Sequence, residues 1–543
     1  MGVPVALAPL RDERVLRPRD TVRPVPEDAI ATPHHEATAA GERAFAAGGN
    51  ALDAALAAAA ALTVVYPHNC ALGGDLFALV RDEHGETASI NASGPAGEAT
   101  DADELRRRVA TMPITGPETI TVPGLVAGWE SLHAAGAVLP WANALADAHA
   151  LAGDGVAVAP SLGAAVAEAD LADPGMAQVF APAGAPLRTG ERLRQPALAD
   201  TLASLAAAGP RTFYDGEVAV RILEGLAACG SRLTEADLRA FVPEVGAPLR
   251  GRFGDLDVLT SPPNSSGVLL LQALAALDAT GGDPLGDDAG AFAEILRLGA
   301  QDRDRWLGDP REAVVDVDAF LGDTRIAEVV RGAAAGAGGE HRPASAQYRE
   351  RPTGDTVAVV AVDGSGRAVS LIQSLFGGFG SHILDPGTGV LFHNRGSFFS
   401  LREGHPNELA PGRRPAHTLM PVMVEHQGRL RGVLGTMGGL VHAQILAQVI
   451  LRLRAGASPQ EAVDAPRWIV GGMEPGEADD TARIEDGVAP EAREALRRAG
   501  FRMCDEPRDS EWLGHAQAIW LDPVLRTGSD RRADGRGDAK RSG

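Results

Sequence analysis

Cysteine is nearly absent from this sequence: its 543 residues include only three, Cys70, Cys229 and Cys504. They are widely spaced and form no Cys-x-x-Cys pair, which excludes a disulfide framework and favours a reducing compartment. Aromatic residues are also scarce, at 4% of the chain. Small alanine and glycine side chains must therefore fill much of the interior, so we expect segments of backbone to pack closely.

Long hydrophobic runs are missing as well. The longest apolar stretch, residues 51–65, is rich in alanine and interrupted by Asp53, which is typical of a buried helix rather than a membrane span. The N-terminus lacks the basic start and apolar core of a signal peptide. We therefore expect a cytoplasmic protein that does not bind membranes.

Basic residues are too few to balance the acidic ones. The chain has 50 Lys and Arg against 72 Asp and Glu, a net charge of −22. Nucleic acids and anionic membranes are poor partners for such a chain, so we expect neither.

The common catalytic motifs are absent too. The sequence has no Walker A loop, no His-Glu-x-x-His, no Gly-x-Ser-x-Gly and no dinucleotide fingerprint. Its fourteen histidines show no ligand spacing. We therefore expect neither a metal site nor a cofactor.

What the sequence does contain is an alternation of helical and strand patterns, which predicts one interleaved α/β (α+β) unit. A Gly-, Ala- and Pro-rich stretch, 332–354, interrupts it and is typical of a loose surface segment. Helices are expected at 36–47, 50–64, 441–454 and over most of 101–308, and strands at 76–80, 87–91, 356–362, 368–375, 418–425 and 430–436.

The boundary at Thr356 is abrupt, because the loose segment ends there and the β-branched run TVAVVAV (356–362) begins. If the bond after Asp355 is cut, Thr356 gains an α-amino group with a reference pKa of about 7.7–8.0. That amine can accept the proton of the Thr356 hydroxyl, so one residue supplies both nucleophile and base. The alternative interpretation is that Thr356 simply begins a strand, where threonine is common.

The hairpin that follows decides which residue faces Thr356. If residues 364–366 form a three-residue loop, Asp363 faces Arg367 and the hydroxyl of Ser374 lies opposite Thr356. A loop longer by one residue places Gln373 there instead.

A glycine-rich turn, Gly435-Thr436-Met437-Gly438-Gly439, comes between an expected strand and an expected helix. Paired glycines let backbone N–H groups turn toward a ligand, as an oxyanion hole requires. The same residues also suit a tight strand-to-helix turn with no other role.

Seven segments, in this order along the chain, resemble the γ-glutamyltransferase family of N-terminal nucleophile hydrolases. SPPNSSGVLLLQAL (261–274) is one of them, and GDTVAVVAVDGSGRAVSLIQSLFGGFGS (354–381) looks like the family's nucleophile strand and hairpin. The segments are 48–80, 122–129, 261–274, 354–381, 385–400, 413–424 and 435–439.

The resemblance implies a four-layer αββα sandwich in which two subunits interleave. It implies self-cleavage between Asp355 and Thr356 into a large subunit, 1–355, and a small subunit, 356–543, as a heterodimer or a dimer of these. Thr356 would form an acyl-enzyme with an amide substrate. Ser374 stands at the position of the family's hydroxyl residue near the nucleophile. Gly438 and Gly439 match the glycines whose amides hold the oxyanion.

At the positions where the family binds the γ-glutamyl group, this sequence has different residues. The family's carboxylate-binding arginine falls in the stretch 91–97, which includes Ser93 and has Pro95 or a neighbour in its place. The other family positions are an Asn replaced by Phe376, a Gln and Asp pair replaced by Arg395 and Phe398, and paired serines replaced by His417 and Thr418.

These departures make glutathione a poor expected substrate unless Arg395 or Arg414 binds its carboxylate. We therefore expect a self-processing amidohydrolase or acyltransferase for a small acid amide, like relatives that act on cephalosporin side chains or oxamate. The residues expected to contact the substrate are Ser93, Phe376, Arg395, His417 and Thr418. A true γ-glutamyl transferase or glutathione hydrolase, and a non-cleaving binding protein, are the alternatives.

Overall fold

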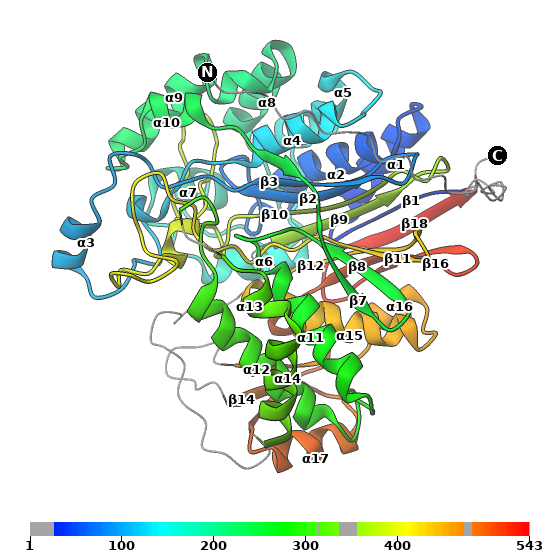
Figure 1. Cartoon of the computed structure of the whole chain (residues 1–543). Helices are drawn as coiled ribbons and strands as arrows, with labels where there is room; N and C mark the ends of the chain where they lie inside the picture. The colour runs from blue at the N-terminus through cyan, green and yellow to red at the C-terminus, as the bar shows by residue number, and fades with distance from the viewer. Residues whose placement is uncertain (1–26, 313–314, 336–355, 472–479, 542–543) are drawn as a thin grey trace, which may run out of the picture.

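The computed structural model describes residues 27–312, 315–335, 356–471 and 480–541. Two β-sheets lie face to face, and helices cover the outer face of each (Figure 1). The predicted four-layer αββα arrangement is confirmed.

The first sheet takes strands from both sides of position 356. Its neighbouring strands are antiparallel, and β9, which begins at Thr356, lies between β1 and β10. In spatial order the strands are β18 (Arg536–Arg541), β1 (Glu27–Thr32), β9 (Thr356–Val362), β10 (Ala368–Ser374), β2 (Asp75–Arg81), β3 (Thr87–Ala92) and β6 (Glu244–Gly246).

The second sheet packs against the inner face of the first. In order it contains β17 (Leu525–Ser529), β16 (Ala516–Leu521), β12 (Arg429–Thr436), β11 (Val422–His426), β8 (Leu256–Thr260) and β7 (Leu249–Phe253). Two small sheets lie outside the sandwich: β13 (Trp468–Val470), β14 (Thr481–Glu485) and β15 (Arg502–Glu506) in one, β4 (Val156–Ala157) and β5 (Arg192–Leu193) in the other.

Helices from the N-terminal part of the chain cover the first sheet, where α1, α2 and α4 contact its strands. The helices of this part of the chain are α1 (His35–Ala46), α2 (Ala51–Val65), α3 (Ala102–Arg108), α4 (Leu125–Ala134), α5 (Trp141–Asp154), α6 (Pro160–Glu168), α7 (Pro174–Phe180), α8 (Pro196–Ala208), α9 (Glu217–Ala228) and α10 (Glu235–Ala240), with the 3₁₀ turns η1 (Pro117–Thr119) and η2 (Pro210–Phe213).

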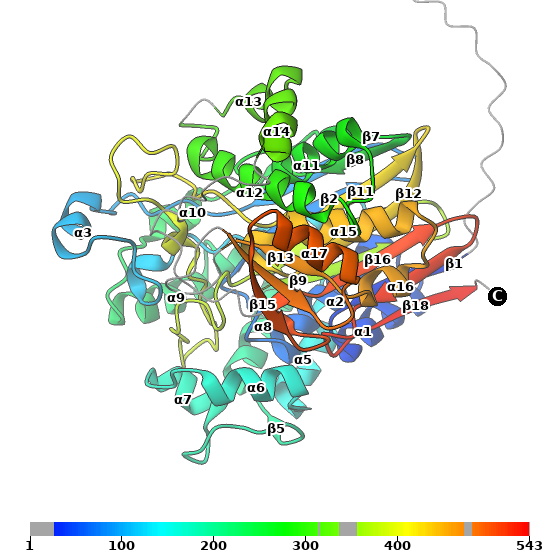
Figure 2. The same ribbon diagram turned by 90° about the horizontal axis from the view of Figure 1, so that it is seen from below.

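The second sheet is covered by later helices, of which α11 and α15 contact its strands and α15 and α17 lie in front of it when the molecule is seen from below (Figure 2). The helices are α11 (Gly267–Thr280), α12 (Ala289–Trp306), α13 (Asp318–Leu321), α14 (Asp323–Ala335), α15 (His442–Arg454), α16 (Pro459–Asp464) and α17 (Pro490–Arg498), with the 3₁₀ turns η3 (Arg395–Phe398), η4 (Gly439–Val441) and η5 (Glu511–Leu513).

Strand β9 shows how the sequence builds these layers. Its odd-numbered side chains, such as Val357 and Val359, join the apolar cluster beneath α2. Its even-numbered side chains, such as Val360 and Val362, join the cluster between the two sheets. Because side chains alternate along a strand, the even-numbered Thr356 also faces the second sheet.

The one acidic residue in the long alanine-rich run caps a helix. Asn50 and Asp53 form a capping box at the start of α2, and the Asp53 carboxylate also accepts N–H groups from Val138 and Leu139. Every residue of α2 is buried, so the small alanine side chains let neighbouring elements approach it from all sides, as the low aromatic content predicts.

Most of the region 101–308 is helical, as expected, but the unpredicted strands β6, β7 and β8 lie within 244–260. The structure corrects one expectation. Residues 332–335 end helix α14 rather than forming a loose segment, and 336–354 lie outside the described residues. Near the C-terminus, Arg536–Arg541 form β18, an edge strand held by backbone pairing with β1.

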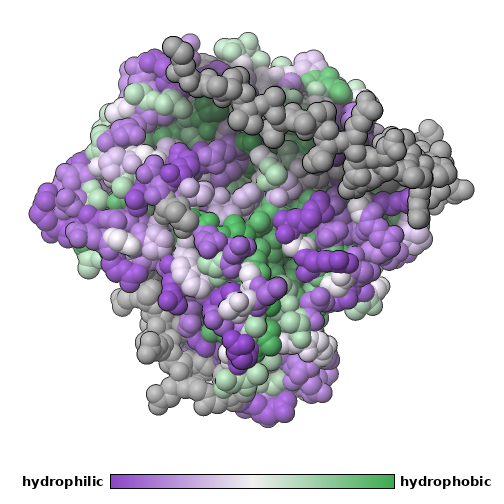
Figure 3. Space-filling model, in the orientation of Figure 1, coloured by the Kyte–Doolittle hydropathy of each residue, from purple (hydrophilic) through white to green (hydrophobic). Residues whose placement is uncertain are grey.

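Hydrophilic side chains dominate the face seen in Figure 3, and hydrophobic ones gather between them near its middle. Among the described residues, no helix combines the length and apolar character needed to cross a membrane.

Candidate active site

Thr356 is the first residue of β9, and its buried side chain faces the second sheet. It is paired in register with Ser374 of β10, as the three-residue hairpin loop predicts. The two side-chain oxygens lie 2.9 Å apart. A second hydroxyl therefore fixes the orientation of the Thr356 side chain. Asp355 lies outside the described residues.

The backbone after Ser374 is strained. Phe376 has a φ of 77°, and Phe379 and His382 also have positive φ. Such conformations cost about 1–3 kcal/mol for residues other than glycine and persist where the surroundings impose them. Here the Phe376 N–H donates to Ser374 Oγ at 2.8 Å, so the strained loop and the two hydroxyls form one unit.

Asp75 of β2 lies opposite Ser374 in the sheet, so Thr356, Ser374 and Asp75 are neighbours on three adjacent strands. Its carboxylate oxygen Oδ2 lies 3.0 Å from His417 Nε2, 3.2 Å from His393 Nδ1 and 3.7 Å from Arg395 Nε. All four side chains are buried. A closed set of charged and polar groups thus lies two strands from Thr356.

The pKa values of this cluster follow from its geometry. Burial alone would raise the pKa of Asp75, but His393 and His417 outweigh it and hold the pKa well below its usual range. Burial and the charge of Arg395 lower the pKa of His417 to about 3, despite its bond to Asp75. His417 is therefore a neutral ring that donates from Nε2 to Asp75 and accepts the Leu419 N–H at Nδ1.

Arg395 connects three of the positions that depart from the family pattern. Its guanidinium lies over the Phe376 ring at 4.0 Å from the centroid. Phe376 in turn packs edge-on against Phe398, with centroids 5.3 Å apart. Arg395 Nη1 also donates to Thr418 Oγ1 at 3.4 Å. These replacements form one cation–aromatic stack rather than separate changes.

Ser93 and Arg414, the two other residues considered for substrate binding, are bonded to side chains of the protein. Ser93 Oγ donates to Asn91 Oδ1 at 2.7 Å and accepts from Asn264 Nδ2 at 3.2 Å. Arg414 forms an ion pair with Glu244 at 2.8 Å. The structure therefore brings Phe376, Arg395, His417 and Thr418 together around Asp75, and it places Arg414 in a different ion pair.

The predicted glycine turn approaches from the second sheet. A Cβ on Gly435 would come within 2.6 Å of Ile372 and 2.9 Å of Ala358, so only glycine allows the two sheets to meet this closely beside Thr356. Gly438 and Gly439 follow with φ values of 146° and 53°. They lead through η4 into α15, whose N-terminal end favours a negative charge.

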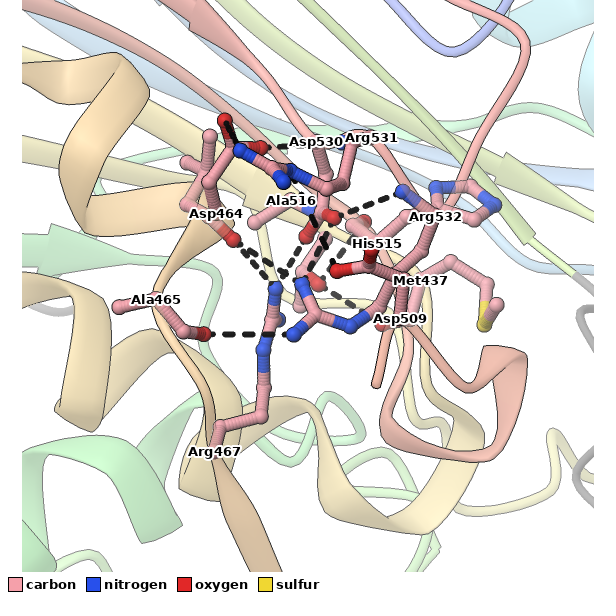
Figure 4. Close-up of polar contacts among 12 residues, drawn as sticks. Met437, Asp464, Ala465, Arg467, Asp509, His515, Ala516, Asp530, Arg531 and Arg532 are labelled. Atoms are coloured by element: carbon pink, nitrogen blue, oxygen red, sulfur yellow. Dashed lines mark hydrogen bonds and ion pairs between the residues drawn. The ribbon is translucent and has the colours of Figure 1, made fainter. Parts of the chain in front are cut away.

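A network of ion pairs lies next to this turn and is connected to it through Met437 (Figure 4). The Met437 N–H donates to the His515 carbonyl at 2.9 Å. Ala516, the residue after His515, donates its N–H to Asp530 Oδ2 at 3.0 Å. Asp530 is paired with Arg467 and Arg532. Burial would raise the pKa of Asp530, but the two arginines hold it below its usual value. The Asp530 carboxylate thus fixes the start of β16, and with it the His515 carbonyl that accepts the Met437 N–H.

Sequence reasoning missed several residues of the site. Asp75 and His393 belong to the buried cluster, and Asn69 Nδ2 donates to the Thr356 carbonyl at 3.5 Å. His442 begins α15 and is neutral, because burial lowers its pKa to about 3. Its Nδ1 donates to the Thr418 carbonyl at 2.9 Å. No local pattern marks these residues, since the fold alone brings them together.

Over the described ranges, no group of His, Cys, Asp and Glu side chains is arranged to hold a metal ion. The side chains gathered in the site are hydroxyls, a carboxylate, imidazoles and a guanidinium. Such a set can attack a carbonyl, orient an acid and stabilise an oxyanion.

Comparisons with known proteins find relatives that match nearly the whole chain. The chain is 36% identical over 519 residues to the oxamate amidohydrolase proenzyme of Klebsiella pneumoniae subsp. pneumoniae, covering 93% of this chain and 96% of the relative. It is 36% identical over 526 residues to the glutathione hydrolase-like YwrD proenzyme of Bacillus subtilis, covering 93% and 97%.

Among solved structures, the cephalosporin acylase from Bacillus halodurans matches with a TM-score of 0.85 and 31% identity, covering 98% of this chain and 99% of the acylase. The profile of the gamma-glutamyltranspeptidase family matches residues 37–539. The chain therefore belongs to the gamma-glutamyltranspeptidase family of N-terminal nucleophile hydrolases.

Proposed function

We propose that this protein is a self-processing amidohydrolase or acyltransferase whose nucleophile is the Thr356 hydroxyl. Cleavage of the 355–356 bond would give Thr356 a free α-amino group, which takes the hydroxyl proton as Oγ1 attacks the amide carbon. The C–N bond breaks and the amine leaves with that proton. Water or an amine then attacks the Thr356 ester, releases the acyl group and restores the hydroxyl.

The observation that carries this proposal is the contact of 2.9 Å between Thr356 Oγ1 and Ser374 Oγ. The nucleophile is thereby oriented toward the second sheet, in which β12 leads into the Gly438–Gly439 turn. Backbone N–H groups of that turn would stabilise the oxyanion formed by the attack. The proenzyme names of the two relatives support processing at Thr356.

The acyl half of the substrate would bind on the Asp75 side of Thr356. We propose that Arg395, with Thr418 and the ring of Phe376, holds a small acid there, because a guanidinium is the strongest carboxylate partner among side chains. His417 already uses both ring nitrogens on Asp75 and Leu419. We therefore assign it the role of fixing Asp75 and Arg395 rather than of touching the substrate.

The similarity to an oxamate amidohydrolase supports a small acid amide, and that to a glutathione hydrolase-like protein supports the γ-glutamyl alternative. A substrate screen separates them. Oxamate and the amides of other short diacids should be hydrolysed, with γ-glutamyl p-nitroanilide a poor substrate. Faster turnover of the anilide would overturn the small-acid assignment and leave the nucleophile assignment intact.

The test of the nucleophile is an intact-mass measurement on the wild type, Thr356→Ala and the matched control Thr356→Ser. We expect the wild type to separate into 1–355 and 356–543 and Thr356→Ala to remain whole. Thr356→Ser keeps a hydroxyl and should still cleave. A wild-type chain that stays at 56.1 kDa after long incubation would rule the mechanism out and favour a binding protein.

A further inference from the structure

A second set of polar side chains lies on the other side of Thr356, around a cavity of about 270 Å³. Asn69 and Met437 connect this cavity to the site, since Asn69 bonds the Thr356 carbonyl and Met437 precedes Gly438. Met437 and His515 lie close together there (Figure 4). Its lining also includes Tyr66, His68, Glu168, Phe379 and Glu511.

The cavity shares no lining residue with the cluster of Asp75, His393, Arg395 and His417. Asp75 lies on β2, beyond β10 when counted from Thr356. Tyr66 instead contacts His34, which follows β1 on the opposite side of β9. An amide bound at Thr356 would thus have its acyl group on the β2 side and its nitrogen substituent directed toward this cavity.

The cavity has unsatisfied polar groups at its inner end. His68, Asn69 and His515 are each more than nine-tenths buried. His68 Nδ1, Asn69 Oδ1 and both ring nitrogens of His515 have no hydrogen-bond partner. Buried polar atoms without partners are costly, so their position in a cavity points to a polar ligand.

The charge of the cavity selects the kind of ligand. Among the described residues, its lining includes Glu168 and Glu511 but no Arg or Lys. Burial lowers the pKa of His68 to about 3 and that of His515 to about 4, so both rings are neutral. Negative and neutral groups beside the rings of Tyr66 and Phe379 favour a cation and repel an anion.

We propose that this cavity binds the amine half of the reaction, as the ammonium form of a leaving or accepting amine that carries an apolar or aromatic group. The proposal rests on the function proposed above. Glu511 at the mouth pairs with the ammonium, while the aromatic side chains contact its apolar part. In acylation the nitrogen leaves with the proton of the Thr356 hydroxyl, takes a second proton from water, and is held as the ammonium ion.

The test is calorimetric titration of the purified wild-type protein with benzylamine, benzyl alcohol and benzoate at about pH 8.5, where Glu511 is ionised and benzylamine is largely protonated. The matched variants are Glu511→Gln and, as a control, Glu403→Gln, because Glu403 is exposed and does not line the cavity. We expect benzylamine to bind most tightly. Glu511→Gln should weaken it about tenfold, and Glu403→Gln should leave it unchanged.

Equal binding of benzylamine and benzoate, no binding of benzylamine, or no effect of Glu511→Gln would overturn the proposal. Benzylamine should also capture the acyl group of a turned-over substrate as an N-benzylamide. Binding without such capture would place the cavity outside the reaction. The titration does not depend on self-cleavage, so its failure is distinct from a failure of the mass measurement on Thr356→Ala.

Discussion

The hydroxyl of Ser374 contacts both Thr356 Oγ1 and the N–H of Phe376. Replacing it by alanine would leave the fold intact but free the nucleophile to rotate. We expect Ser374→Ala to lower kcat about tenfold or more, with little change in KM, because one hydrogen bond to a reacting group is worth about 1–3 kcal/mol. Steady-state kinetics on the best amide substrate measures this.

Ser370 is the matched control, since it lies on the same face of β10 and donates to the Leu434 carbonyl at 2.7 Å. Ser370→Ala should lower the thermal midpoint and keep kcat. Equal losses of kcat in the two variants would show that Ser374 acts only through stability.

Replacing Asp75 should affect stability, because its carboxylate is the shared partner of His393, His417 and Arg395. We expect Asp75→Asn to destabilise the protein by about 3–5 kcal/mol, the range for removing one partner of a buried ion pair. Asp147→Asn, which breaks a more exposed pair with Arg43, should cost less than about 1 kcal/mol.

The pH dependence of stability tests the same cluster. Neighbouring groups hold the pKa of folded Asp75 below its usual range, so the unfolded chain binds the proton first. The stability from Asp75 is therefore present above about pH 4 and declines as the pH falls below it. Thermal midpoints of the wild type and Asp75→Asn should converge below that pH. A constant difference would contradict the assignment.

At this scale the sequence could predict the pair Thr356 and Ser374, because one hairpin with a short loop sets their register. It could not predict the Asp75 cluster. His417 lies 342 positions from Asp75, and both residue types are common in loops and strands. Only the sheet order brings the two together.

At the scale of elements, the end of β12 depends on close contact between the sheets. We expect Gly435→Ala to push the sheets apart beside Thr356, because its Cβ would overlap Ile372 and Ala358. Overpacking of this kind costs about 1–3 kcal/mol, and self-cleavage should also slow. Mass spectrometry over time and thermal unfolding measure the two effects.

Gly246 provides the control, since a Cβ there would meet nothing within 4 Å. Gly246→Ala should leave both quantities close to the wild type. Unimpaired cleavage in Gly435→Ala would show that the sheets can separate without disturbing Thr356.

The elements themselves differ in how far sequence could predict them. The runs that became β9 and β10 are apolar and rich in β-branched residues, and the run that became α15 has helical spacing, so their prediction succeeded. Strands β7 and β8 were missed inside a helical region, and β18 was missed because RGDAKR has no strand pattern. Its conformation comes from pairing with β1, a long-range contact that outweighs local preference.

At the scale of the molecule, a cut before Thr356 would leave two chains that share one sheet. Strand β9 of the later part pairs with β1, and β10 pairs with β2, both from the earlier part. We expect fragments 1–355 and 356–543 to elute together on size exclusion in native buffer and to separate only in denaturant. Separation in native buffer would contradict the interleaved arrangement.

The pairing of β1 with β18 also has a consequence for biosynthesis. The Thr32 carbonyl and its partner Ser529 Oγ are 497 positions apart, and β18 leaves the ribosome later still. Until then β1 has no neighbour on its outer edge, and an unpaired edge strand is a template for aggregation. Nascent chains stalled before β18, or truncations that remove it, should therefore depend on chaperones to remain in solution.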